Sequence, residues 1–239
     1  MVKFPSDKIF SIGYYSQTIS IYNHLEKSYN IGKEGLINLY KDMGNVSAKL
    51  DQFNDALQHY RKSIQFAKEI LPNTNNTGFS ATLNDLANLC AKFEKYELAL
   101  EYYDKAIAIN KSIASDLGQT KSLELSTNYH GIGNVYLKMA QFEKALGYYK
   151  KAKEISSACL KGDKNLEVGK SLYQIAYTYR KKGDYNSSYM IFEECLSTFN
   201  SIFKRDPHNE YIARTKKEME RITSYVNREE IDRIIKELN

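Results

Sequence analysis

Residues 129–155 read YHGIGNVYLKMAQFEKALGYYKKAKEI, and two helical patterns meet in this stretch across a short polar joint. Small residues recur where two helices would have to touch, at Gly133, Ala145 and Ala152. Large residues surround them, at Ile132, Tyr136, Phe142 and Tyr149. Small residues let neighbouring backbones approach, and large residues fill the grooves beside them. The stretch therefore predicts a helical hairpin.

The same arrangement recurs along the chain at a nearly fixed period. The aromatic residue that opens each second helix recurs at intervals of 43, 43, 46 and 43 residues, at Phe10, Phe53, Tyr96, Phe142 and Tyr185. Small and aromatic residues follow in steps of 3, 4 and 3, which keeps them on one helical face. The first helix carries its own set, exemplified by Tyr129, Ile132 and Gly133, and this set occurs four times.

This pattern of eight positions in four tandem copies resembles the tetratricopeptide repeat family, over about residues 8–225. The usual period of that family is about 34 residues. The longer period here is similar to the repeats of kinesin light chains, of spindle-orientation adaptors and of bacterial peptide-sensing regulators. The resemblance implies an all-α fold, a right-handed α-solenoid of stacked antiparallel helix pairs.

We expect one domain over residues 1–239, because no linker of flexible composition divides the chain. Its predicted parts are a half repeat at 8–31, repeats at 33–70, 79–114, 119–159 and 166–203, and a degenerate capping repeat at 207–239. Residues 71–78 are dense in turn formers and predict a loop. Asp206 and Pro207 predict the N-cap and first position of the capping helix. Glu220 replaces the small residue there, which favours a solvent-facing cap.

Composition points to an ordinary globular chain. Apolar residues make up 42% and charged residues 26%, and the formal net charge of +5 is mild. Basic residues alternate with acidic ones, so we expect no nucleic-acid partner. The three cysteines lack ligand spacing, which favours a reducing compartment over disulfides or zinc. No signal peptide or apolar run of roughly 18 residues is visible, so we expect a cytoplasmic protein without a membrane partner.

No pattern of catalytic residues emerges. The four histidines have no His or Cys ligand four residues away, and neither HExxH nor GxSxG occurs. Gly32 to Gly35 lack the spacing of a phosphate-binding loop. Cys90 and Cys195 occupy core positions of the repeat, where packing is their expected role. We therefore predict no enzyme, no metal site and no cofactor.

The resemblance implies that the first helices line a concave groove, and that the residue after each small Gly or Ala faces it. These residues are Asn45, Asn88, Asn134 and Tyr177, and Lys49, Lys92, Lys138 and Lys181 stand four positions later. The expected groove also includes Lys41 and His130. Asn can hold a peptide backbone with both a donor and an acceptor. A row of lysines favours acidic side chains or a terminal carboxylate.

A sharper comparison concerns the carboxylate clamp of chaperone-binding repeat domains. Lys41 and Asn45 match its first pair. Asp85 stands where that clamp has a second Asn, and an acid facing a carboxylate would repel it. Thr127 and Gly131 stand where it has Lys and Arg. The sequence therefore disfavours this clamp.

The sequence predicts a non-enzymatic scaffold or adaptor that holds a peptide or helix of a protein partner in the groove, as a subunit of a larger assembly. The alternative is a regulatory protein whose solenoid changes shape when a peptide binds. Whether the groove or the convex face and end caps carry the main contact stays open. So does self-association, because a solenoid with apolar ends can stack on another copy.

Overall fold

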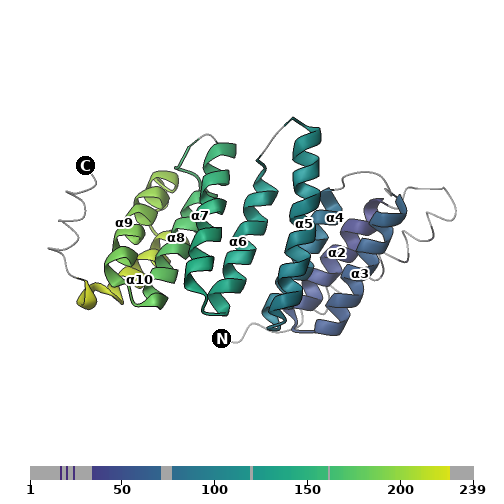
Figure 1. The fold of residues 1–239 in the computed structure, drawn as a ribbon, viewed down its shortest axis with the longest axis horizontal. Helices are drawn as coiled ribbons and strands as arrows, with labels where there is room; N and C mark the ends of the chain where they lie inside the picture. The colour runs from purple at the N-terminus through teal and green to yellow at the C-terminus, as the bar shows by residue number, and fades with distance from the viewer. Residues whose placement is uncertain are drawn as a thin grey trace. The chain divides into compact units, whose positions relative to one another are not determined.

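A computed structural model describes residues 34–70, 77–118, 121–160 and 162–226, together with the single positions 17, 20 and 24. The α-helices in these ranges are α2 (Glu34–Lys49), α3 (Phe53–Ile70), α4 (Thr77–Lys92), α5 (Tyr96–Asp116), α6 (Leu123–Lys138), α7 (Phe142–Cys159), α8 (Leu166–Lys182), α9 (Tyr185–Ile202) and α10 (Glu210–Glu220) (Figure 1). A short 3-10 helix, η1 (Thr223–Tyr225), follows α10. The described ranges contain no strand, which confirms the all-α fold class.

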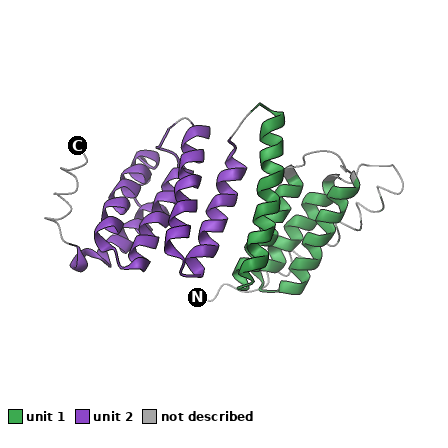
Figure 2. Ribbon diagram, viewed as in Figure 1, with its two compact units in different colours: residues 1–120 green, residues 121–239 purple. Residues whose placement is uncertain are grey.

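The helices pack as consecutive antiparallel pairs, α2 with α3, α4 with α5, α6 with α7 and α8 with α9. The chain divides into two compact units, residues 1–120 and residues 121–239 (Figure 2). In the first unit α4 packs on both α2 and α3, and in the second α8 packs on α7. This stacking of helix pairs confirms the predicted solenoid. The predicted single domain over residues 1–239 stays a prediction.

Each first helix ends in the same way, with one residue in the left-handed region. The residues are Asp51, Glu94, Ala140 and Gly183, with φ of 62°, 60°, 56° and 90°. The next amide donates back to a carbonyl of the last helical turn, as in Gln141 N to Tyr136 O at 2.9 Å and Asp184 N to Tyr179 O at 3.0 Å. This is the Schellman-type ending of a helix, and it reverses the chain within two residues. Only Gly183 adopts this conformation without a Cβ penalty.

Complementary volumes hold each pair together. The predicted small positions of the second helices are fully buried, as Ala99, Ala145 and Ser188 illustrate. A Cβ added to Gly133 of α6 would lie 2.6 Å from the ring of Tyr149, and one added to Gly169 of α8 would lie 2.4 Å from the ring of Phe199. Both rings therefore occupy the space that a side chain on the first helix would need.

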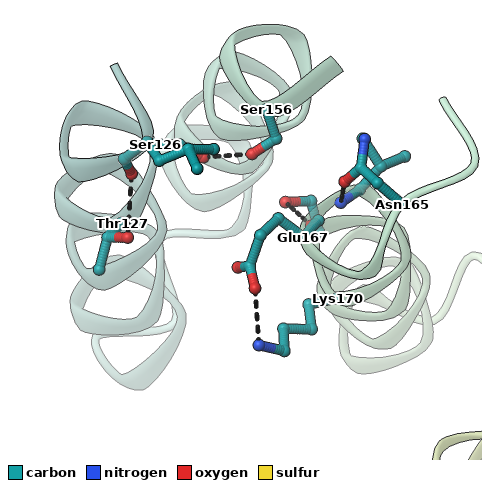
Figure 3. Close-up of polar contacts among 9 residues, drawn as sticks. Ser126, Thr127, Ser156, Asn165, Glu167 and Lys170 are labelled. Atoms are coloured by element: carbon teal, nitrogen blue, oxygen red, sulfur yellow. Dashed lines mark hydrogen bonds and ion pairs between the residues drawn. The ribbon is translucent and has the colours of Figure 1, made fainter. Parts of the chain in front are cut away.

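One position near the start of each first helix corresponds to one position on the second helix of the same pair. The sizes of the two residues differ from pair to pair. The four pairs of equivalent positions are Ile37 and Ala67, Ser80 and Asn110, Ser126 and Ser156, and Gly169 and Phe199. Ser80 donates to Asn110 Oδ1 at 2.6 Å, and the Ser126 and Ser156 hydroxyls lie 2.6 Å apart (Figure 3). The first and last pairs thus combine one large residue with one small one, and the middle two combine small polar residues that bond to each other.

Two helix starts differ from the prediction. The helix expected from residue 119 begins at Leu123, because Ser122 accepts a hydrogen bond from Leu125 N at 3.3 Å and caps it. The prediction that Asp206 and Pro207 open the last helix is wrong. Asn209 caps α10 by accepting from Tyr211 N at 3.1 Å. Asn209 N donates to Asp206 O at 3.1 Å, so Pro207 lies inside a tight turn, where proline is equally favoured.

The last helix closes the second unit, with Ile212 and Ile222 buried against α8 and α9. Its buried Glu218 pairs with Arg180 of α8 at 3.1 Å and with Arg221 at 2.6 Å. Glu220 is exposed, as the capping interpretation predicts.

Three predictions fall wholly or partly outside the described residues. The half repeat at 8–31 is described only at Gln17, Ser20 and His24, which are helical and exposed. The helix expected at 228–238 lies outside them. Of the loop expected at 71–78, only Thr77 and Gly78 are described, and they begin α4.

Candidate functional site

The asparagines predicted to face the groove are each bound to a tyrosine of the following helix. Three hydrogen bonds recur at equivalent positions: Tyr60 Oη donates to Asn45 Oδ1 at 2.7 Å, Tyr103 Oη to Asn88 Oδ1 at 2.5 Å, and Tyr149 Oη to Asn134 Oδ1 at 2.7 Å. The small residue before each Asn makes room for the ring, since a Cβ on Gly44 would lie 2.5 Å from Tyr60. The ring therefore crosses the first helix at that point, and its hydroxyl reaches the next side chain.

The fourth repeat replaces both members of this pair. Tyr177 stands at the asparagine position and Phe192 at the tyrosine position. Phe192 is fully buried and packs edge-on against Tyr173, with ring centroids 5.6 Å apart. A hydroxyl on Phe192 would have no amide at the equivalent place, so the two replacements are consistent with each other.

The tyrosine bonds fix how each amide is oriented. Burial raises the pKa of Tyr60 and of Tyr103, and the charge of Asp85 raises both further, so both hydroxyls stay protonated and donate. The carbonyl of each Asn points to its tyrosine, which leaves the NH2 group for another partner. We had expected Asn to offer both a donor and an acceptor, and the acceptor is largely used within the hairpin.

The NH2 groups differ in what they meet. Asn45 Nδ2 donates to Asp85 Oδ2 at 3.4 Å, and Asn134 Nδ2 lies 3.5 Å from His130 Nδ1. Asn88 is exposed. Burial raises the pKa of Asp85, while the hydrogen bond from Asn45 and the charge of Lys41 act in the opposite direction. Asp85 thus occupies the end of the Asn45 amide that a clamp would offer to a carboxylate.

The predicted lysines lie at the carboxyl ends of the first helices. Lys49, Lys92 and Lys138 are each the last residue of α2, α4 and α6, and Lys181 lies in the last turn of α8. A cation there interacts favourably with the helix dipole. Lys92 Nζ also lies 2.5 Å from Ala48 O and from Asp51 Oδ1, which ties it to the end of α2.

The remaining predicted lysines differ in their surroundings. Lys181 Nζ lies 5.7 Å from the centroid of the Tyr177 ring. Lys41 is half-buried, and Lys49 and Lys138 are exposed. The shared role expected for these lysines therefore stays a prediction.

His130 is the most enclosed of the predicted site residues. Its ring meets that of Tyr149 edge-on at 5.3 Å. Burial lowers the pKa of His130, with Lys170 adding to the decrease and Glu167 and the main chain of Lys170 opposing it. Its Nε2 is shielded from solvent and has no hydrogen-bond partner within the described chain.

His130 lines a cavity of about 220 Å³ inside the second unit. The other lining residues come from α8, α9 and α10 and are Lys170, Tyr173, Gln174, Phe199, Tyr211 and Arg214. At its rim Lys170 pairs with Glu167 at 2.8 Å, near the Asn165 cap of α8 (Figure 3). Sequence reasoning missed this site, although Tyr173 occupies the same repeat position as Lys41 and His130 and could have been found that way.

The described residues were also compared with what a reactive cysteine, a metal site or a membrane-spanning helix requires. Burial raises the pKa of Cys90 to about 11 and that of Cys195 to about 12, which keeps both thiols protonated and unreactive. Across the described ranges no three His, Cys, Asp or Glu residues form a group that could hold a metal ion. None of the helices there combines the length and apolarity that a membrane span requires.

Solved structures with the same fold include a crystal structure of BtubC (BKLC) from P. vanneervenii. It is 17% identical, with a TM-score of 0.67, and the match covers 91% of each chain. A putative kinesin light chain of Podosopora anserina with nearly identical repeats is 13% identical, with a TM-score of 0.64, over 86% of this chain and 94% of that one. At these identities the likeness shows the fold alone.

A third similar structure is the Rap conjugation gene regulator of the plasmid pLS20 in complex with the Phr* peptide. It is 15% identical, with a TM-score of 0.66, over 89% of this chain and 53% of that one. No match was found among curated proteins. The model of the tetratricopeptide repeat matches residues 35–112 and 124–201, well over half of the chain. With the helix pairs and their repeated contacts, this match shows that the chain belongs to the tetratricopeptide repeat family.

Proposed function

We propose that this chain is a non-enzymatic interaction protein that holds an extended segment of a partner protein along the first helices of its repeats. The observation that carries the proposal is the asparagine held by a tyrosine hydroxyl that recurs in the repeats, at Asn45 and Asn88 in the first unit and at Asn134 in the second. An amide fixed in this way presents its N–H groups without further loss of side-chain entropy. In the exposed Asn88 the NH2 group faces no such partner, whereas Asn45 and Asn134 each direct one N–H to Asp85 and to His130 and have the second N–H left for a peptide. The backbone carbonyls of an extended peptide are acceptors for such donors.

The lysines at the ends of the first helices would add a preference for acidic segments. Lys49 and Lys138 are exposed, and opposite charge on a partner steers association more than it adds to affinity. The three free cysteines suit a reducing, intracellular compartment.

The test is a selection of random peptides displayed against the full chain, followed by calorimetry with the enriched peptides. We expect Asn45→Ala and Asn88→Ala to weaken binding at least tenfold each. Asn54→Ala is the matched control, because Asn54 is exposed on a second helix, α3, and should leave affinity unchanged. Circular dichroism checks that all variants keep their helices. Equal affinities for wild type and both groove variants would rule out the groove, and attention would pass to the convex face and the caps.

A regulatory role is the second candidate. It is favoured by the likeness in fold to the Rap regulator solved with a peptide, although this chain spans about half of that one. A regulatory role predicts that an enriched peptide changes the radius of gyration of the protein, measured by small-angle scattering. A scaffold would bind the same peptide without such a change.

A further inference from the structure

The cavity of the second unit contains a donor that the described chain leaves unused. Asn134 Oδ1 accepts from Tyr149 Oη at 2.7 Å and from Gln174 Nε2 at 3.4 Å, so its Nδ2 is the atom facing His130 Nδ1 at 3.5 Å. Because an amide nitrogen only donates, His130 Nδ1 must accept and the imidazole proton must lie on Nε2. That N–H is shielded from water and has no partner in hydrogen-bond geometry, although the main chain of Lys170 is near enough to oppose the lowering of the His130 pKa.

The charge around the cavity is positive. Its lining contains Lys170 and Arg214 and no carboxylate. Lys170 is partly neutralised by Glu167, at 2.8 Å. Arg214 Nε donates to the Tyr173 hydroxyl, which carries no charge, at 2.8 Å, and the guanidinium lies 4.6 Å from the centre of that ring. Such stacking holds the guanidinium flat while its terminal nitrogens stay able to donate.

The remaining wall is aromatic except for Gln174. Phe199 and Tyr211 come from α9 and α10, with ring centroids 5.2 Å apart, and Tyr173 lies on α8. The cavity of about 220 Å³ is smaller than the roughly 300–1,000 Å³ of pockets for whole small ligands. It therefore suits one residue of a longer molecule.

We propose that this cavity anchors the partner segment by binding a carboxylate group together with the aromatic or large apolar side chain that carries it or lies next to it in the partner. The carboxylate accepts from Arg214, Lys170 and His130 Nε2, and the apolar part packs on Phe199 and Tyr211. This inference rests on the proposed function and adds an anchor to it. The carboxylate could be the end of the partner chain or an acidic side chain beside an aromatic one, and the two sources can be told apart.

Three small probes test the chemistry on the full chain. N-acetyl-phenylalanine has the ring and a terminal carboxylate, its amide has the ring alone, and N-acetyl-glutamate α-amide has a side-chain carboxylate without a ring. Proton NMR of the imidazole Cε1–H signals reports binding, because the chain has only 4 His residues. We expect N-acetyl-phenylalanine to shift the His130 signal and to bind at least tenfold more tightly than its amide. Tighter binding by the glutamate probe would assign the carboxylate to a side chain.

Variants test whether the carboxylate probe binds in this cavity or is held only by the net positive charge of the protein. Arg214→Gln and Lys170→Gln should each weaken the binding of N-acetyl-phenylalanine at least fivefold. They should leave the affinity for its amide unchanged. Arg205→Gln removes the same charge from an exposed residue in the turn before α10 and should have no effect. Equal affinities of acid and amide, or equal losses in Arg205→Gln and Arg214→Gln, would overturn the proposal.

The anchor and the proposed function fail in different experiments. Asn45 and Asn88 belong to the first unit, and the cavity lies wholly in the second. Selected peptides that lose affinity in Asn88→Ala but bind Arg214→Gln normally would overturn the anchor alone. Probes that bind the cavity when no peptide is selected would overturn the proposed function alone.

Discussion

The contact between Gly133 and Tyr149 leaves no room for a methyl group, and this can be tested within one pair of helices. A Cβ at Gly133 would lie 2.6 Å from the ring, so Gly133→Ala should destabilise the second unit by about 1–3 kcal/mol through overpacking. Gly147 lies on the adjoining helix α7 with nothing within 4 Å of such a Cβ. Gly147→Ala should therefore stabilise by up to about 1 kcal/mol, because Ala is the better helix former. Urea denaturation followed by circular dichroism measures both, and a loss in both would refute the packing argument.

His130 makes stability depend on pH. Burial lowers its pKa in the folded chain, so below the ordinary value the unfolded chain binds more protons than the folded one. Stability from this residue is therefore complete above about pH 6.5 and decreases as pH falls below it, by up to about 1.4 kcal/mol per pH unit. His59 has a lowered pKa for the same reason and contributes in the first unit.

The measurement is the urea midpoint at pH 7.5 and at pH 5.5. His130→Gln should lose less stability over this interval than wild type, whatever its stability at pH 7.5. His208 is exposed, so His208→Gln should retain the wild-type pH dependence. Parallel curves for wild type and His130→Gln would contradict the explanation.

The shared ending of the first helices predicts opposite effects for one substitution at two sites. Ala140 adopts φ of 56°, a conformation in which a side chain costs roughly 1–2 kcal/mol. Ala140→Gly should relieve this and stabilise the chain by about 0.5–1 kcal/mol after the entropy cost of glycine. Ala108 is exposed in the middle of α5, so Ala108→Gly should destabilise by about 1 kcal/mol. Thermal melting measures the stability of both variants. Equal losses of stability would contradict the backbone strain assigned to Ala140.

The α8–α9 pair should accept the tyrosine–asparagine contact of the other three pairs. Phe192→Tyr alone should cost about 1–3 kcal/mol, because it buries a hydroxyl without a partner. Adding Tyr177→Asn supplies the amide at the equivalent place. A double-mutant cycle should therefore give a favourable coupling of about 0.5–1.5 kcal/mol. Additive effects would mean that α8 and α9 are not spaced like the other pairs.

Helix positions followed from the sequence where caps and small residues agree. The predicted openings of α7 at Phe142 and of α9 at Tyr185 match the structure, as do the end of the third repeat at Cys159 and the start of the fourth at Leu166. The start of α10 did not follow, because Asp-Pro is equally favoured in a tight turn and at a helix start. Only the later Asn209, with its bond to Tyr211 N, decides between the two.

The two units should respond separately to a local defect. Each has its own buried cluster, around Leu36, Tyr40 and Met43 in the first and around Leu172, Phe192 and Ile212 in the second. In repeat proteins stability is approximately a sum over neighbouring repeats. Gly133→Ala should therefore speed amide hydrogen exchange in α6 to α9 and leave α2 to α5 nearly unchanged. Equal acceleration in all helices would show that the chain unfolds as one cooperative unit.

Only part of the candidate site could be predicted from the sequence, because the prediction used the repeat pattern of the whole chain. The repeat pattern ranks positions, so it placed His130 and the asparagine row together as groove residues. It describes α10 only as part of a degenerate capping repeat, whereas α10 contributes Tyr211 and Arg214 to the cavity. A terminal helix considered only as a cap is thus part of the strongest candidate binding site.

The differing sizes of these residues also determine which first helix can pack against which second helix during folding. The helix with Gly169 leaves a space that the Phe199 ring fills, whereas Ser126 at the equivalent position bonds to the small Ser156 and to the Ala152 carbonyl. A first helix that met the second helix of another repeat would therefore clash or leave a void. Nearly identical repeats are prone to such exchange, within one chain or between two. This chain distinguishes its own partners by volume, so its hairpins should assemble in sequence order even though their signatures are alike.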